Sequence, residues 1–257
     1  MDEKMKNKRG QMTIWIIVAI AILVFIILLF IFQRKLNVPV IEKVEEDPKG
    51  FISNCVKKYV QESIDIMLPQ GGFIKPEHTK MYNGLNVSYL CYNAGNYNPC
   101  INEHPLLINE IKEEMKNYII PRVGQCFEDY KIEIEKREGQ VSLGAMNLDI
   151  ELAPDRIFVS IDKDVNLRIK EQSYNYNEFD IVIINPIYDL SRLAMEIASQ
   201  EAKYCYFEYA GYMILYPEFK IKRDVLSDST EIYTLQDKKS RKEMNIAVRS
   251  CAIPPGL

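Results

Sequence analysis

Cysteines are the residues whose chemistry constrains this chain of 257 residues most strongly. There are six of them, and all follow a long apolar segment near the N-terminus: Cys55, Cys91, Cys100, Cys126, Cys205 and Cys251. An even number of cysteines on one side of such a segment is typical of disulfides formed in an oxidising compartment. Several pairings are possible, and the spacing favours Cys91–Cys100 across a short polar loop, Cys55–Cys126 between two predicted helices, and Cys205–Cys251 between the last helix and the C-terminal strand.

A metal site and buried free thiols are the alternatives to disulfides. The chain contains no C-x-x-C pair and only two histidines, His78 and His104. Structural zinc usually takes four closely spaced Cys or His ligands. The spacing therefore favours disulfides and predicts no metal or other cofactor, while buried free thiols stay open as an alternative.

Catalytic motifs of the usual kinds are missing from the sequence. There is no G-x-S-x-G elbow, and Gly71-Gly72 follows a predicted helix, whereas a phosphate-binding loop follows a strand. Glu133 and Glu135 alternate with isoleucines, which predicts the solvent-facing side of a strand. A Ser-His-Asp set whose members meet only in the fold stays open. We therefore predict no enzymatic activity, with an extracellular enzyme or ligand-binding module as the alternative.

Tyrosines gather in the last predicted helix. The chain contains 16 Tyr, and five of them lie in this segment. Tyr209, Tyr212 and Tyr216 are at helical spacing, and Tyr204 and Tyr206 precede them. Aromatic side chains are enriched at protein interfaces, so these residues predict a contact surface for a partner or a glycan. The alternative is a stripe of core residues whose hydroxyls reach the rim of the domain.

Residues 73–104 are predicted to form a long polar loop with one short strand. The segment contains six Asn and four Tyr, and Asn favours turns through local side-chain hydrogen bonds. It also contains Asn86-Val87-Ser88, which has the N-glycosylation pattern. Asn86 is therefore a candidate glycosylation site.

A long apolar segment precedes all of these residues. Residues 14–32 include no charged residue and form an unbroken run of 19 apolar residues. Because a helix rises about 1.5 Å per residue, residues 12–32 reach about 30 Å, the thickness of the hydrocarbon core of a bilayer. The pattern predicts one transmembrane helix within residues 11–35 and makes the lipid bilayer the first expected partner.

Charge is distributed unevenly around this segment. The formal net charge is −4; residues 1–35 contain six basic and two acidic residues, so residues 36–257 hold −8. The basic residues before the apolar run place the N-terminus in the cytoplasm and the rest outside. An acidic body argues against nucleic acid as a partner, so other cell-surface proteins or further copies of the chain are the expected protein partners.

The junction before the apolar run, Lys8-Arg9-Gly10-Gln11, resembles the class III signal sequence of archaeal type IV pilin-like proteins. The resemblance covers the N-terminal segment only. It implies that a membrane peptidase cuts between Gly10 and Gln11 and that the apolar helix is retained. Pilins that polymerise carry Glu at the fifth mature position, where this chain has Trp15, and this departure argues against filament assembly. An uncleaved signal anchor is the alternative.

The overall layout also resembles, more loosely, an uncharacterised group of membrane-anchored surface proteins in small-genome archaea. The features that carry the resemblance, apart from the junction at Gly10, are Cys55-Val56, Gln70-Gly71-Gly72-Phe73, Cys126 after a long helix, and Ile246-Ala247-Val248-Arg249 near the end. It implies a membrane location and a fold, and it implies no particular chemistry.

Beyond a linker over residues 36–50, the sequence predicts helices and strands. Apolar spacings of three and four predict helices over 51–68, 105–130 and 190–216, the second kinked or split at Pro121. Alternation with a period of two predicts strands over 131–136, 140–143, 147–152, 156–161, 165–169 and 179–184, and closing strands over 228–235 and 244–248. Asp162-Lys163-Asp164 is expected to form a hairpin turn.

Together these patterns predict four segments and an α+β fold. Residues 1–10 form a basic cytoplasmic segment or cleaved leader, 11–35 the transmembrane helix, 36–50 the linker, and 51–257 the extracellular domain. In that domain about three helices are expected to pack on an antiparallel, meander-like sheet. The chain is thus predicted to be a single-pass structural or interaction protein of the cell surface, with a disulfide-stabilised domain outside the cell. This prediction includes a pilin-like assembly.

Overall fold

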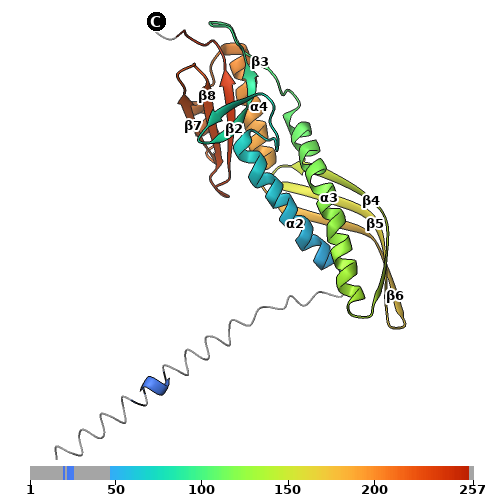
Figure 1. The fold of residues 1–257 in the computed structure, drawn as a ribbon. Coiled ribbons are helices and arrows are strands. Elements are labelled where there is room, and N and C mark those ends of the chain that lie inside the picture. Colours follow the sequence, from blue (N-terminus) through green and yellow to red (C-terminus); the bar gives the residue numbers. More distant parts are fainter. Residues whose placement is uncertain (1–19, 21, 26–46, 255–257) are drawn as a thin grey trace, which may run out of the picture. The chain divides into compact units, whose positions relative to one another are not determined.

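The computed structural model describes residues 20, 22–25 and 47–254 (Figure 1). The chain divides into two units, Met1–Val44 and Glu45–Leu257. The predicted leader over 1–10, nearly all of the predicted span over 11–35 and most of the predicted linker lie outside the described residues. Among the residues that are described, no helix combines the length and the apolar character needed to cross a bilayer.

Helices and strands alternate in blocks through residues 47–254. The helices there are α2 (Pro48–Met67), the short 3-10 helix η1 (Leu68–Gln70), α3 (Leu107–Glu135), α4 (Ile187–Tyr204) and α5 (Tyr209–Leu215). The strands are β1 (Thr79–Tyr82), β2 (Leu85–Tyr92), β3 (Ile101–Asn102), β4 (Gln140–Ala153), β5 (Arg156–Ile169), β6 (Gln172–Ile184), β7 (Phe219–Val225), β8 (Glu231–Asp237) and β9 (Glu243–Arg249). The predicted α+β class is correct.

The strands form two sheets where the sequence predicted one. Strands β4, β5 and β6 form the expected antiparallel meander. The second sheet has six strands in the order β1-β2-β9-β8-β7, with β3 beside β2. Its strands are antiparallel except for β2 and β9, which pair in parallel, so the expectation of purely antiparallel pairing is wrong here. Residues 73–104 therefore contribute strands to this sheet and are not one long loop.

The meander has longer strands than predicted. Strand β5 runs through Asp162-Lys163-Asp164, where a hairpin turn was expected, and a bulge takes up the irregular register at this point. The Lys163 ammonium donates to the Gly144 carbonyl of β4 at 2.5 Å, so these polar residues are held inside the pairing. The turns lie instead at Asp155 and Lys170, which both have a positive φ.

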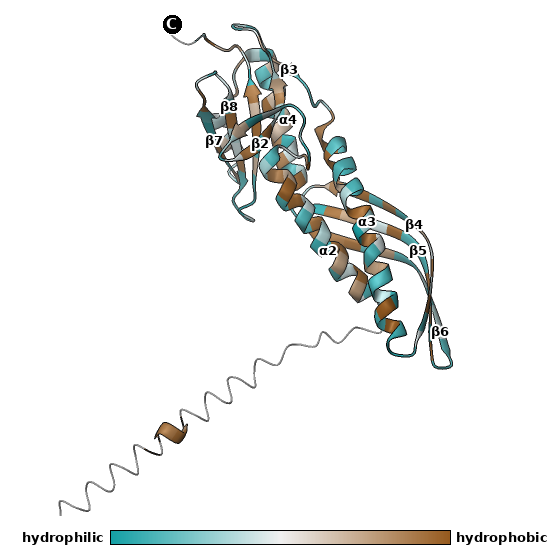
Figure 2. Ribbon diagram, viewed as in Figure 1, coloured by the Kyte–Doolittle hydropathy of each residue, from teal (hydrophilic) through white to brown (hydrophobic). Residues whose placement is uncertain are grey.

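Helices α2 and α3 pack on one face of the meander (Figure 1). Helix α2 begins at Pro48, with the Asp47 side chain accepting from the Lys49 amide as its N-cap, so the last residues of the predicted linker are helical. Apolar side chains of both helices enter one large core that continues to α4 and to the six-stranded sheet. Near the turn that joins β5 to β6, the meander extends beyond the part that these helices cover, and hydrophilic residues are found there (Figure 2).

The predicted strand over 131–136 is wrong, because α3 continues to Glu135. On the helix, Glu133 forms ion pairs with Lys136 and Arg137, three and four residues later. Of the two alternating isoleucines, Ile134 is buried and Ile132 is 48% exposed. Extending an existing helix adds one hydrogen bond for each residue, so one buried isoleucine is enough to stabilise this last part of α3. Pro121 lies inside α3 and does not split it.

The last predicted helix is divided in two. Helix α4 ends at Tyr204, and the next residue, Cys205, caps it in a left-handed conformation with φ 58°. Phe207 is almost fully buried between the two helices in sequence, and α5 starts at Tyr209 with the Glu208 side chain accepting from the Gly211 amide at 3.2 Å. The break turns α5 away from the direction of α4 and brings Tyr212 and Tyr216 opposite α4.

Three disulfides join the elements of this domain: Cys55–Cys126, Cys91–Cys100 and Cys205–Cys251. They are the three pairs that the spacing favoured. The first joins α2 to α3, the second joins β2 to the segment before β3, and the third joins the end of α4 to the residues after β9. No cysteine in the part of the chain that the structure describes is free.

Gly72 stands in a conformation and a space that only glycine fits. Its φ is +100°, and a Cβ there would lie 2.7 Å from Cδ1 of the buried Ile111. We expect Gly72→Ala to lower the free energy of unfolding by about 3 kcal/mol, since backbone strain and overpacking each cost about 1–3 kcal/mol. Urea denaturation followed by far-UV circular dichroism measures this.

Gly84 provides the matched control for this substitution. It also has a positive φ, +81°, but a Cβ there meets nothing within 4 Å. Gly84→Ala should therefore cost only the backbone strain of about 1–2 kcal/mol. Equal losses for the two substitutions would contradict the packing part of the argument.

Candidate binding site

A cleft with a volume of about 980 Å³ lies between α4 and α5. Helix α4 supplies one wall, α5 and the start of β7 supply the other, and single residues from α3, the β4–β5 turn and the end of β8 complete it. Its lining combines tyrosines with charged side chains. Clefts of this size that present a few polar groups on an aromatic wall are the usual form of binding sites in proteins.

One polar face of α4 lines the cleft. Asp189, Arg192, Glu196 and Ser199 follow one another at spacings of three and four residues, so they lie on the same side of the helix. The opposite side of α4 carries Leu190, Ala194 and Ile197 into the core. The start of the helix is held by the Asn185 side chain, which accepts from the Ile187 amide at 3.0 Å.

Two tyrosines of α5 and its end form the aromatic wall. The rings of Tyr212 and Tyr216 lie with their centroids 4.5 Å apart and their planes at 31°. Tyr212 also contacts the buried Phe207, with 5.4 Å between the ring centroids. Burial, followed by the nearby Tyr216 hydroxyl and the Glu196 carboxylate, raises the pKa of Tyr212. The wall is therefore anchored in the core at one end and faces carboxylates at the other.

The cleft is acidic. Five carboxyl side chains line it, against two cationic ones, Arg192 and Lys239. The carboxyl groups belong to Asp155, Asp189, Glu196, Glu218 and Asp237. Burial, and then the carboxylates of Asp155 and Asp237, raise the pKa of Asp189. The shift therefore reflects mainly the loss of water around the Asp189 carboxyl, with the neighbouring carboxylates as smaller causes.

The tyrosines proposed from sequence are brought together only in part. Tyr212 and Tyr216 line the cleft. Tyr209 packs partly buried against the core, and Tyr204 lies at the end of α4, 62% exposed, beside the Lys203 ammonium. Sequence reasoning missed Tyr188 and the charged residues of α4, although their spacing of three and four along a helix was a signal that could have found them.

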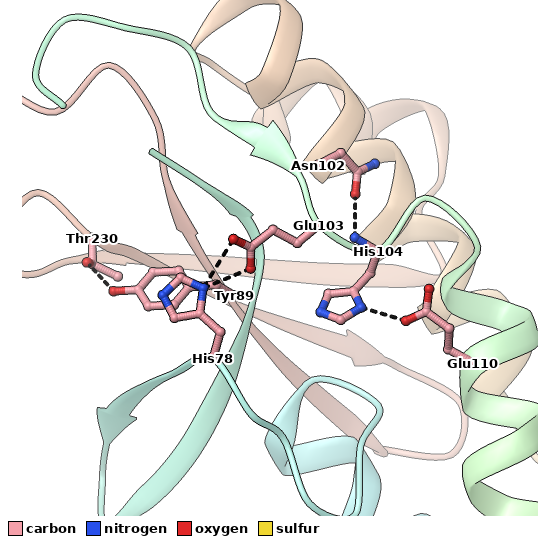
Figure 3. A network of polar contacts seen from close by, with 7 residues as sticks. All are labelled: His78, Tyr89, Asn102, Glu103, His104, Glu110 and Thr230. Carbon is pink, nitrogen blue, oxygen red and sulfur yellow. Dashed lines mark hydrogen bonds and ion pairs between the residues drawn. The ribbon is translucent and has the colours of Figure 1, made fainter. Parts of the chain in front are cut away.

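The two histidines line a second, smaller pocket with a volume of about 340 Å³ (Figure 3). His78 Nδ1 lies 2.8 Å from Glu103 Oε2, and its ring contacts Tyr89 with 4.8 Å between the centroids. His104 Nδ1 lies 2.5 Å from Glu110 Oε2, and its ring contacts Phe73. Each imidazole thus has its own carboxylate partner: His78 precedes β1, Glu103 and His104 follow β3, and Glu110 lies on α3.

The chemistry of this pocket is limited by its contacts. Ser88 is buried in its lining, but within residues 47–254 no hydrogen bond joins a serine hydroxyl to either imidazole. A search of the described residues finds no group of three or more His, Cys, Asp or Glu side chains that could hold a metal ion. The pocket presents two separate imidazole–carboxylate pairs.

Asn86 lies at the start of β2, beside the turn that joins β1 to β2. It is exposed, whereas Ser88 of the same pattern is 2% exposed. Glycosylation at Asn86 stays a prediction.

Comparisons with known proteins leave the structure as the main guide to function. No family model, no curated protein and no solved structure matches the chain. The protein has an α+β domain with three disulfides, an acidic cleft with a tyrosine wall, and a smaller pocket lined by both histidines.

Proposed function

We propose that this chain is a membrane-anchored interaction protein of the cell surface. The apolar segment over residues 12–32 holds it in the bilayer with the N-terminus in the cytoplasm, and the domain over residues 51–257 stands outside. The observation that supports this placement best is the pairing of all six cysteines in three disulfides, because disulfides persist mainly in oxidising compartments.

The cleft between α4 and α5 supports the interaction role. It combines an anchored aromatic wall with unpaired charged groups, whereas the acidic body of the chain disfavours nucleic acid as a ligand. The binding partner in this proposal is another protein at the cell surface, and the cleft is where that partner is held.

Processing behind Gly10 belongs to the same proposal as its finer part. The resemblance at Lys8-Arg9-Gly10-Gln11 implies a mature chain that begins at Gln11 and keeps the apolar helix. Trp15 in place of the expected Glu favours a membrane anchor over a filament subunit. Peptide mapping of the N-terminus on protein purified from membranes tests this part separately.

Labelling of intact cells tests the placement. A membrane-impermeant amine reagent should modify exposed lysines of the domain, such as Lys170 and Lys239, without lysis. A thiol reagent should modify none of the six cysteines until a reductant is added. Lysine labelling that requires lysis, or six thiols that react without reductant, would contradict the proposal. A cytoplasmic protein probed in the same cells is the control for membrane integrity.

The second candidate is a membrane-anchored ligand-binding module or enzyme that uses the pocket of the two histidines. The observation that favours it is that His78, Glu103 and His104 line one small cavity, and that each imidazole has a carboxylate partner. Affinity selection of small molecules followed by mass spectrometry tests it. A compound retained by the natural chain and lost by a His78→Ala/His104→Ala variant would favour this function.

A further inference from the structure

We propose that the acidic cleft between α4 and α5 binds a cationic segment of a partner protein, in which arginine or lysine side chains alternate with apolar ones. This inference rests on the proposed interaction role and states the chemistry of the partner. The cationic group would contact the Tyr212 ring and the carboxylates of Glu196 and Glu218, which line the same cleft.

Unpaired charge is the first argument. None of the five carboxylates that line the cleft forms an ion pair with a cation of the described residues, and the same is true of Arg192 and Lys239. Among residues 47–254, the Glu196 carboxylate accepts a hydrogen bond from the Gln200 amide alone, at 2.6 Å. A cleft with an excess of three negative charges raises the local concentration of cations and excludes anions.

The aromatic wall is the second argument. A guanidinium or ammonium group over a tyrosine face is attracted by the negative face of the ring. This chain already contains such an arrangement elsewhere. The Arg122 guanidinium lies 3.5 Å from the centroid of the Tyr118 ring, and the Tyr118 hydroxyl donates to the Glu62 carboxylate. The cleft offers the tyrosine and the carboxylates of this arrangement, and among the described residues neither Arg192 nor Lys239 in its lining forms an ion pair with those carboxylates.

The exposed rim of the cleft is the third argument. No residue of α5 is buried, and Ile214 and Leu215 at its end are 80% and 75% exposed. Leu215 also lines the cleft. An acidic floor beside an exposed apolar edge is complementary to a chain segment that alternates apolar and cationic side chains. A neutral glycan would stack on the tyrosines but would leave the carboxylates uncompensated.

A peptide-binding measurement on the full-length chain tests the inference. The chain is placed in nanodiscs of phosphatidylcholine, which has no net charge, and empty nanodiscs serve as the blank. The probe is a fluorescein-labelled peptide of alternating leucine and arginine, followed by fluorescence anisotropy. The same peptide with citrulline in place of arginine tests the charge alone. We expect the arginine peptide to bind at least about tenfold more tightly, and more weakly as salt is added.

Two double variants locate the site. Glu196→Gln/Glu218→Gln removes two charges from the cleft, and both residues are exposed, so folding should be retained. Glu171→Gln/Glu178→Gln removes the same charge from exposed positions on the meander and is the matched control. We expect about tenfold weaker binding for the first variant, in line with the coupling of close charge pairs across interfaces, and less than about twofold for the second. Glu196→Lys/Glu218→Lys should bind the corresponding leucine–glutamate peptide instead.

Each outcome separates this inference from the proposed function. Equal affinity for the arginine and citrulline peptides, equal effects of the two double variants, or no binding to the natural chain would overturn the cationic partner. Binding of a neutral oligosaccharide that depends on Tyr212 would also overturn it, while leaving the interaction role in place. Tight, charge-dependent binding in nanodiscs with no surface labelling of intact cells would instead contradict only the placement.

Discussion

Replacing Cys55 and Cys126 together by alanine is expected to lower the free energy of unfolding by about 4 kcal/mol, the largest loss that we expect from any change in this domain. The two cysteines join α2 to α3 and are 71 residues apart in sequence. In the chain-entropy description, a disulfide stabilises the folded state by restricting the unfolded chain, and a longer closed loop is restricted more. The helices that this disulfide joins also form the cover of the three-stranded meander.

The disulfide Cys91–Cys100 offers a matched comparison. Its cysteines are only 9 residues apart, so replacing both by alanine should cost about 2–3 kcal/mol on the same reasoning. Both pairs lose two sulfur atoms from largely buried positions, and the difference between the variants therefore reports mainly the loop length. Urea denaturation of the full-length chain, followed by far-UV circular dichroism, measures both. An equal or smaller loss for Cys55→Ala/Cys126→Ala would contradict the prediction.

A buried tyrosine between two carboxyl groups gives the second large effect. Tyr233 Oη lies 2.5 Å from Glu201 Oε1 and 2.9 Å from Glu231 Oε2. Glu231 is also bound by the Arg223 guanidinium through two hydrogen bonds. Tyr233 is fully buried and Glu201 is 1% exposed. The cluster thus connects α4 to β7 and β8 through one hydroxyl.

The two carboxyl groups of this cluster share one hydroxyl hydrogen. A tyrosine hydroxyl has one hydrogen to donate, so it can satisfy only one of the two carboxylates. Arg223 forms an ion pair with Glu231 through two hydrogen bonds, whereas burial, ahead of the other causes, raises the pKa of Glu201. The Tyr233 hydroxyl lies within hydrogen-bond distance of both carboxyl groups, and burial favours the protonated form of Glu201.

The variant Glu201→Gln is expected to become more stable relative to the natural chain as the pH rises. A carboxyl whose pKa is higher in the folded state than in the unfolded state stabilises the fold fully below the unfolded pKa. This contribution is lost as the pH rises through the folded pKa. Glutamine does not titrate, so the difference in unfolding free energy between the variant and the natural chain should grow in favour of the variant from pH 4 to pH 9.

Denaturation curves at several pH values within this range measure the difference. The matched control is Glu62→Gln, which changes an exposed carboxyl that also accepts a tyrosine hydrogen bond. It should alter stability by less than about 1 kcal/mol at every pH, as surface substitutions usually do. Parallel stability curves for Glu201→Gln and the natural chain would mean that folding does not shift the pKa of Glu201, and would contradict the prediction.

Local patterns in the sequence were sufficient for several elements. The helix over 51–68 was predictable because apolar residues at spacings of three and four must share one face, and the glycines after it end it: Gly71 has a φ of +84°. The alternating strands of the meander and the α+β class follow from the same kind of short-range information. The even set of cysteines confined to one side of the apolar segment predicted disulfides, and their spacing favoured the pairs that the structure forms.

Contacts between distant segments decided the rest. The alternation of residues 131–136 fits either a strand or a helix. These residues are helical up to Glu135 because they continue α3, with Ile134 as the isoleucine that packs in the core. The parallel pairing of β2 with β9 joins segments more than 150 residues apart, which no local pattern reveals. The cleft arises because the chain turns at Cys205 and sets Tyr212 and Tyr216 of one helix segment opposite Glu196 of another. Sequence alone thus determined which segments are apolar, periodic or cross-linked, and only the tertiary structure determined which side chains meet, because that depends on how the helices and strands pack together.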